Sequence, residues 1–222
     1  MSPICVLGWI EDLAKDLQAI GADSPPAPRW NQDWFPRLDA AAAYAIVRMT
    51  RPRRVVEVGS GHSTRFLARA VADGAAATDI VSIDPAPRAS IAALPIRHLT
   101  CRVQDVDIAL FRALMPGDIL FIDSSHQAKP GSDVDFLMAQ VLPILQAGVR
   151  VHFHDIFLPD DYPAEWAWRR YNEQQAVESL LNDGFALEFS SHQARRQRLN
   201  GVLSRLPLAA GAHESSFWLR KH

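Results

Sequence analysis

A β-branched run that ends in a glycine turn and continues as an apolar helical pattern places the strongest constraint on this 222-residue chain. Residues 55–58 read Val-Val-Glu-Val, the turn is Gly59-Ser60-Gly61, and residues 63–72 have helical spacing. A strand, a tight turn and a helix in this order place backbone N–H groups at the carboxyl end of a parallel strand. Because open α/β sheets bind their ligands at that edge, the sequence predicts a binding site here.

The rest of the chain alternates short apolar runs with helical patterns. Helices are expected at residues 9–20, 38–49, 134–145 and 174–181, and strands at 80–83, 96–103, 118–123, 149–155, 185–189 and 216–219. Five strand–helix units followed by two strands predict an α/β fold. Its sheet would be mostly parallel, covered on both faces and closed by an antiparallel strand pair. Residues 1–36, a helix and an aromatic linker, would extend a main domain at residues 37–222.

Composition argues against several classes of function. The 23 Lys and Arg residues nearly balance the 25 Asp and Glu residues, so the chain lacks the basic field that nucleic-acid binding requires. Two cysteines are too few for a disulfide framework or a thiolate metal site. The first ten residues lack the basic start of a signal peptide, and no apolar run reaches membrane-spanning length. We therefore expect a cytoplasmic protein that binds neither nucleic acid nor membranes.

Acidic side chains lie at the ends of three expected strands. Glu57 precedes the glycine turn, Asp84 ends the second strand, and Asp105 follows the third. In a doubly wound sheet these positions converge on one crevice. A carboxylate at Asp84 can accept hydrogen bonds from both hydroxyls of a ribose. The same spacing occurs in nicotinamide-binding folds, so Asp84 alone does not separate the two kinds of cofactor.

The pattern Glu57-x-Gly59-x-Gly61 resembles the first motif of class I S-adenosylmethionine (SAM)-dependent methyltransferases, which have a Rossmann-like fold. In that motif the acidic residue faces the methionine end of the cofactor, and a carboxylate there suits a cationic ligand better than a pyrophosphate. Ser63 either caps the next helix or reaches the cofactor carboxylate. The resemblance implies the following cofactor-binding residues: Glu57, Gly59, Ser60, Gly61, Ser63, Asp84, Asp105 and Asp123.

Two further segments carry candidate catalytic groups. Asp123 ends the fourth expected strand and His126 follows three residues later, whereas His154 and Asp155 end the fifth. Neighbouring strand ends could present Asp123, His154 and Asp155 to one divalent ion. Oxygen ligands favour Mg²⁺, and an imidazole among them shifts the preference towards Mn²⁺. The ion would lower the pKa of a substrate hydroxyl, and His126 could remove the proton as general base.

These segments also resemble known families. Asp-x-x-His followed by an acidic pair resembles macrolide sugar, cephalosporin-hydroxylase-like and catechol-type O-methyltransferases, and residues 40–190 resemble the type 24 methyltransferase family. The resemblance implies that Asp123 and Asp155 hold Mg²⁺ and that His126 is the base. His154 stands where these families have Glu or Asp, so a metal-free mechanism with a base alone stays open.

We therefore expect a SAM-dependent O-methyltransferase for a small hydroxylated acceptor, such as a sugar or a natural-product intermediate, with Asp123, His126 and His154 as catalytic residues. The sequence leaves open a nicotinamide-dependent oxidoreductase, a non-catalytic SAM-binding protein and N-methylation. The aromatic segment 160–171 is expected to cover the acceptor pocket. The aromatic residues Trp30, Trp34 and Phe35 would close the pocket from the other side, pack against the sheet or contact a second subunit of a homodimer.

Overall fold

The computed structural model describes residues 3–21, 24–196 and 199–222, and seven strands among them form one sheet in the order β3-β2-β1-β4-β5-β7-β6. The strands are β1 (Arg54–Val58), β2 (Asp79–Ile83), β3 (Arg97–Leu99), β4 (Ile119–Ile122), β5 (Arg150–Phe153), β6 (Phe185–Ser190) and β7 (Phe217–Lys221). Strand β7 runs antiparallel to both β5 and β6, and the pairs among β1 to β5 are parallel. The expected α/β architecture with an antiparallel strand pair at its end is confirmed.

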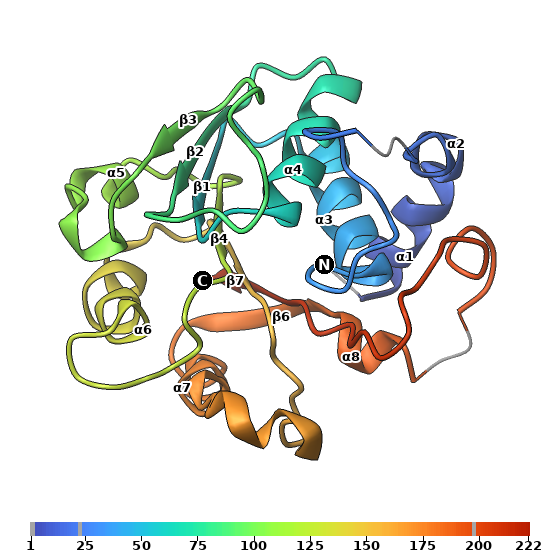
Figure 1. Cartoon of the computed structure of the whole chain (residues 1–222). Coiled ribbons are helices and arrows are strands. Elements are labelled where there is room, and N and C mark those ends of the chain that lie inside the picture. Colours follow the sequence, from blue (N-terminus) through green and yellow to red (C-terminus); the bar gives the residue numbers. More distant parts are fainter. Residues whose placement is uncertain (1–2, 22–23, 197–198) are drawn as a thin grey trace.

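Helices cover both faces of the sheet (Figure 1). On one face lie α1 (Pro3–Asp12), α2 (Ala14–Gln18), α3 (Arg37–Thr50), α4 (His62–Asp73) and α8 (Ser191–Ala194). On the other face lie α5 (Ala109–Arg112), α6 (Asp133–Phe136) and α7 (Glu173–Leu180). Each layer buries its own apolar cluster against the sheet, which therefore separates two cores. No helix in the described part of the chain is long and apolar enough to cross a bilayer.

Helix α3 brings a carboxylate into the core. Its residues Ala40–Ala43 and Ala45 are fully buried, because small side chains let the helix lie close to α4 and the sheet. Asp39 in its first turn is also fully buried, and both backbone N–H groups of Ser215 and Ser216 donate to its carboxylate. These bonds satisfy a charge that burial would otherwise make costly.

Two helical expectations differ from the structure. The helix expected at 134–145 is α6 followed by a π-helical stretch, Leu137–Val141, and a 3₁₀ turn, Leu142–Ile144, because Pro143 has no N–H group to continue the ladder. No helix joins β2 to β3 in the described chain, so the expectation of five strand–helix units was wrong. That connection, residues 84–96, carries prolines at 85, 87 and 95, which disfavour a helix.

Candidate active site

Gly59 and Asp123 approach each other backbone to backbone beneath the glycine turn. Gly59 has a φ of +85°, and a Cβ atom there would lie 1.8 Å from the carbonyl oxygen of Asp123, so only glycine fits. The backbone N–H of Gly61 donates to Oγ1 of Thr64 at 2.9 Å, which ends the turn where α4 begins. The turn therefore holds the end of β1 against the end of β4.

Glu57 lies beneath this turn and does not line a cavity. Its carboxylate is fully buried and accepts hydrogen bonds from Oγ of Ser63 at 2.7 Å, Oγ1 of Thr64 at 2.7 Å and Oγ of Ser82 at 2.8 Å. Burial raises the pKa of Glu57 to about 7, and the three hydroxyl donors partly oppose this rise. The carboxylate joins β1, β2 and α4, so Glu57 supports the loop from below where the motif had implied a cofactor contact.

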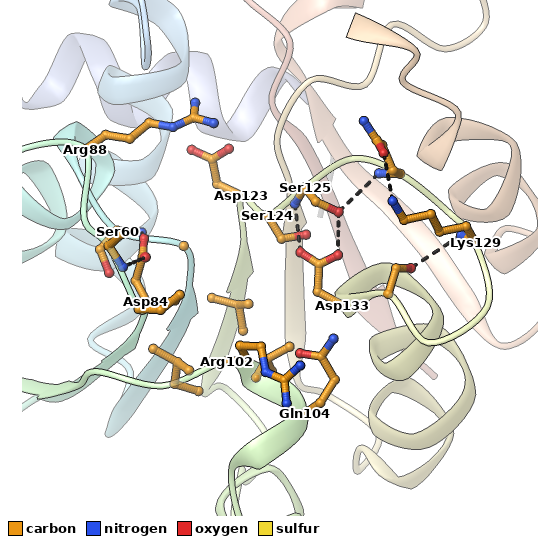
Figure 2. Close-up of a pocket in the computed structure, with 18 residues that line it drawn as sticks. Ser60, Asp84, Arg88, Arg102, Gln104, Asp123, Ser124, Ser125, Lys129 and Asp133 are labelled. Carbon is orange, nitrogen blue, oxygen red and sulfur yellow. Dashed lines mark hydrogen bonds between the residues drawn. The ribbon is translucent and has the colours of Figure 1, made fainter.

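A cavity of about 520 Å³ opens at the carboxyl ends of β1, β2 and β4 (Figure 2). Ser60 and Asp84 lie on one side of it, Ser125 and Asp133 lie opposite, and Asp123 lies between them. One oxygen of Asp84 accepts from the backbone N–H of Ser60 at 2.7 Å, and the other accepts from that of Ala86 at 2.7 Å. These bonds aim the Asp84 carboxylate along the cavity wall.

The expected cofactor residues divide into two groups. Gly59, Ser60, Asp84 and Asp123 line the large cavity, and Gly61 and Ser63 line the small cavity described next. The contact expected for Asp105 is not supported, because its exposed carboxylate forms two hydrogen bonds with Arg102, at 2.9 and 2.8 Å. The hydrogen bond from Arg102 also holds the pKa of Asp105 below its usual value. Gln104, one residue earlier, lines the cavity instead.

A second cavity, of about 70 Å³, shares Ser60, Arg88 and Asp123 with the first. Its wall combines residues of the glycine turn, the ends of β4 and β5, the N-terminal linker and the aromatic segment after β5. The lining residues are Asp33, Trp34, Phe35, Ser60, Gly61, His62, Ser63, Arg88, Asp123, His154, Asp155, Trp166, Arg169 and His213. Asp123 therefore lies at the boundary between a large and a small cavity.

His126 lies behind Asp123 and is almost completely buried. Its Nδ1 lies 2.9 Å from Oε2 of Glu173, and its Nε2 lies 3.3 Å from Oδ1 of Asp123 and 3.5 Å from Oδ2 of Asp155. His126 has a φ of +57°, in the left-handed region that few non-glycine residues adopt. His126 lines neither cavity, so Asp123 and Asp155 lie between it and any molecule bound there.

His154, like His126, contacts carboxylates with both of its ring nitrogens. Its Nε2 lies 3.2 Å from Oδ2 of Asp39, and its Nδ1 lies 3.6 Å from Oδ1 of Asp123 and 3.4 Å from Oδ1 of Asp155. Asp155 has the same φ of +57° and accepts from Oγ of Ser215 at 3.2 Å. Each imidazole thus has one nitrogen near both Asp123 and Asp155. The other nitrogen faces a carboxylate that the second imidazole does not contact, Glu173 for His126 and Asp39 for His154.

The charges of this cluster favour ionised groups. Burial alone would lower the pKa of His126, but its hydrogen bonds with Asp123 and Glu173 raise that pKa well above 6.5. Burial would likewise lower the pKa of His154, but Asp155, Asp123 and Asp39 raise it well above 6.5. Burial opposes ionisation of Asp123, yet the two imidazoles keep its pKa well below the usual range. These directions favour the protonated form of both imidazoles.

The predicted metal site does not fit this arrangement. Among residues 3–21, 24–196 and 199–222, no group of three or more His, Cys, Asp or Glu side chains is arranged to hold a metal ion. Nδ1 of His154 faces Asp155 and Asp123, and Nε2 faces Asp39, an arrangement that an imidazolium would satisfy without an ion. The structure therefore does not support the expectation that Asp123, His154 and Asp155 bind Mg²⁺ or Mn²⁺.

Two carboxylates of the cluster were missed in the sequence. Asp39 comes from α3 and Glu173 from the start of α7, and neither is near Asp123 along the chain. A lone acidic residue in the alanine-rich run 38–47 was the one available signal for Asp39. No local pattern marks Glu173. His152, the third histidine of this region, is fully buried, stacks on Phe121 at 3.7 Å and lies outside both cavities.

Comparisons with known proteins agree with this geometry. Residues 56–156 match the model of a methyltransferase domain family, type 24. This span runs from β1 to the end of β5 and includes Gly59, Asp84, Asp123 and His154, whereas Asp39 and Glu173 lie outside it. A comparison with curated proteins finds no match.

Three solved structures share the fold at low sequence identity. The SAH-bound methyltransferase PaMTH1 of Podospora anserina is 16% identical, with 96% of this chain and 88% of that chain covered and a TM-score of 0.52. An O-methyltransferase of Bacillus cereus in complex with SAH is 13% identical, with 98% and 91% covered and a TM-score of 0.53. A branched-chain polyamine synthase of Thermus thermophilus is 15% identical, with 94% and 63% covered and a TM-score of 0.51. The TM-scores show a common fold.

Proposed function

We propose that this chain, a class I SAM-dependent methyltransferase whose methyltransferase domain spans residues 56–156, methylates a hydroxyl oxygen of a small molecule. The position of Asp123 carries this proposal. Its carboxylate borders the large cavity at the glycine turn, borders the small cavity beside it, and contacts both protonated imidazoles. Cofactor and acceptor would meet at this boundary.

The large cavity suits the cofactor. SAM, when bound, supplies a methyl group that its sulfonium already activates. Ser60 and Gly59 let the ligand approach the backbone, and Asp84 can accept hydrogen bonds from ribose hydroxyls. Gln104 offers an amide for the adenine edge in place of the expected Asp105. The protein contributes mainly alignment, because the reacting oxygen must lie in line with the bond that breaks.

The proton of the acceptor hydroxyl would leave through Asp123 and His126. Glu173 faces Nδ1 of His126, so a neutral His126 keeps its proton there and leaves Nε2 as the basic nitrogen. Nε2 lies 3.3 Å from Asp123, which borders the acceptor cavity. As the acceptor oxygen takes the methyl group that bound SAM would supply, its proton would pass by way of Asp123 to Nε2 of His126.

His154 would act as a fixed positive charge. Asp39 holds Nε2, and Nδ1 points to the carboxylates of Asp123 and Asp155 at the edge of the small cavity. An imidazolium in this place stabilises negative charge that develops on the attacking oxygen. No step in this mechanism requires a metal ion, because the donor arrangement described above does not offer one a site.

The test begins with the cofactor. Calorimetric titration of S-adenosylhomocysteine into the pure protein should show micromolar binding, about −8 kcal/mol. Hydroxylated acceptors are then screened with methyl-labelled SAM, and the label is located by mass spectrometry and NMR. A label on oxygen supports the proposal. A label on nitrogen contradicts the proposed acceptor atom, and absence of S-adenosylhomocysteine binding contradicts the cofactor assignment.

A further inference from the structure

Arg169 lines the small cavity, which we assign to the acceptor, and forms no ion pair with any residue that the structure describes. It ends the 3₁₀ helix Ala164–Arg169, in the aromatic segment that follows β5. Its guanidinium carbon lies 4.2 Å from the ring centre of Trp166, and Nη1 donates to the hydroxyl of Tyr171 at 3.2 Å. Its Nε is buried and has no hydrogen-bond partner. An arginine has five N–H donors, so most of this guanidinium is unused.

The carboxylates of the same cavity are paired with other groups. Asp123 and Asp155 contact the imidazoles of His126 and His154, and Asp33 at the rim is exposed to solvent. In the described part of the chain, no ion pair includes Arg169 or Arg88, although both line the cavity. The two guanidinium groups that line the cavity therefore have no carboxylate partner in the described part of the chain, whereas Asp123 and Asp155 each contact imidazoles.

His62 is a second residue of this cavity with an unused polar atom. It lines the cavity, and its buried Nδ1 has no hydrogen-bond partner. Burial lowers its pKa to about 4, and the positive charges of Arg65 and Arg29 add to this effect. Burial is the largest cause and Asp33 opposes it, so the neutral form of His62 is favoured and its ring remains available as a hydrogen-bond donor.

We propose that the acceptor carries an anionic oxygen group, a carboxylate or a phosphate, that binds the guanidinium of Arg169 while the hydroxyl faces Asp123. This inference rests on the proposed function and names the charge of its substrate. A guanidinium stacked on an aromatic face presents its N–H groups at its edge, where a planar carboxylate or a phosphate accepts two of them. Such a bond would satisfy the buried Nε, which otherwise carries a desolvation cost.

The test compares three ring-matched probes that differ in charge. These are 3-hydroxybenzoate, 3-hydroxybenzyl alcohol and 3-hydroxybenzylamine, each titrated into the protein saturated with S-adenosylhomocysteine. We expect the anion to bind at least about tenfold more tightly than the alcohol, the ratio that one charge-assisted bidentate contact supplies, and the amine to bind most weakly. Inorganic phosphate should compete with the anion.

Variants assign the preference to Arg169. Arg169→Gln should remove it and leave the affinity for S-adenosylhomocysteine unchanged, whereas Arg169→Lys, which keeps the charge without the planar fork, should retain part of it. Arg170→Gln, an exposed neighbour outside the cavity, should retain all of it.

Equal or tighter binding of the alcohol or the amine would overturn the inference. So would a preference that survives Arg169→Gln, or failure of the anion to bind at about 10 mM, where even a millimolar site fills. Failure of S-adenosylhomocysteine to bind in the first step would instead overturn the proposed function, so the two failures are distinguishable.

Discussion

Nε2 of His154 lies 3.2 Å from Oδ2 of Asp39, although 115 residues separate them in the chain. The contact links the end of β5 to the first turn of α3, which lies outside the matched methyltransferase domain. Asp39 borders neither cavity, so it acts on the site only through His154 and the backbone of Ser215 and Ser216. It is a positioning residue.

Asp39→Asn tests this relationship. The amide nitrogen would face Nε2 of His154, which then loses a proton and its positive charge. Turnover should fall about 10- to 100-fold, as for other groups that orient a catalytic side chain, while the affinity for S-adenosylhomocysteine stays unchanged. The matched control is Asp79→Asn, an exposed partner of Arg54. If the double variant Asp39→Asn/His154→Gln shows fully additive losses, the two residues act independently and the assignment fails.

The rate should rise with pH through a pKa above 6.5. The proposed base is the neutral form of His126, and Asp123 and Glu173 hold its pKa well above 6.5, so most molecules are inactive at neutral pH. Glu173→Gln removes a group that favours the imidazolium, and the rising limb of the rate profile should therefore move to lower pH. Glu178→Gln, on the exposed side of the same helix, should leave the profile in place. An unmoved profile in Glu173→Gln would contradict the role of His126.

Asp123→Asn should separate catalysis from cofactor binding. The amide keeps the shape of the carboxylate but cannot pass a proton to His126, so turnover should fall at least about 100-fold, the usual contribution of general acid–base catalysis. Affinity for S-adenosylhomocysteine should change by less than about threefold, since SAM retains its other contacts. The control is Asp105→Asn, which breaks an exposed ion pair with Arg102. Comparable loss of cofactor binding and turnover in Asp123→Asn would contradict this division of roles.

Gly59→Ala should abolish cofactor binding. The added Cβ would lie 1.8 Å from the carbonyl oxygen of Asp123, and the φ of +85° would be strained for alanine, so the turn must move. Calorimetry should detect no S-adenosylhomocysteine binding, and the melting temperature should fall. Gly8→Ala, at an exposed position of α1 with no atom within 4 Å of the new Cβ, should bind normally and gain up to about 1 kcal/mol of stability. Normal binding by Gly59→Ala would show that the turn is not the cofactor site.

Chelation of divalent ions should leave turnover unchanged. Nδ1 of His154 faces Asp155 and Asp123 and Nε2 faces Asp39, and an imidazolium in this place would have no lone pair for an ion. Turnover of protein dialysed against EDTA is compared with turnover after addition of Mg²⁺ or Mn²⁺. A rate that disappears with EDTA and returns with either ion would contradict the structure-based rejection of the metal site.

Much of the site followed from strand ends. Parallel strands bring their carboxyl ends to one edge, so Gly59, Asp84, Asp123 and His154 could be placed together from spacing alone. Contacts between distant segments could not. Asp39 and Glu173 reach the imidazoles across 115 and 47 residues, and no periodic pattern encodes those distances.

Two errors have local causes. Glu57 alternates with Val56 and Val58 along β1 and therefore points to the α4 side of the sheet, where serine and threonine hydroxyls surround it. Because Glu57 does not line the large cavity, the case against a nicotinamide cofactor does not rest on a direct contact with it, and the sheet order with antiparallel β7 shows the fold alone. Asp105 and Gln104 are adjacent in one 3₁₀ turn, where the sequence does not tell which side chain faces inward.

In the proposed mechanism the imidazole at position 154 changes the source of the positive charge at the site. A site built from carboxylates must bind an ion from its surroundings, and its activity depends on the supply of that ion. The imidazolium of His154, held by Asp39 from the N-terminal half of the chain, would instead bring the charge with it. Such a site would acquire its positive charge when the chain folds, whatever ions surround it.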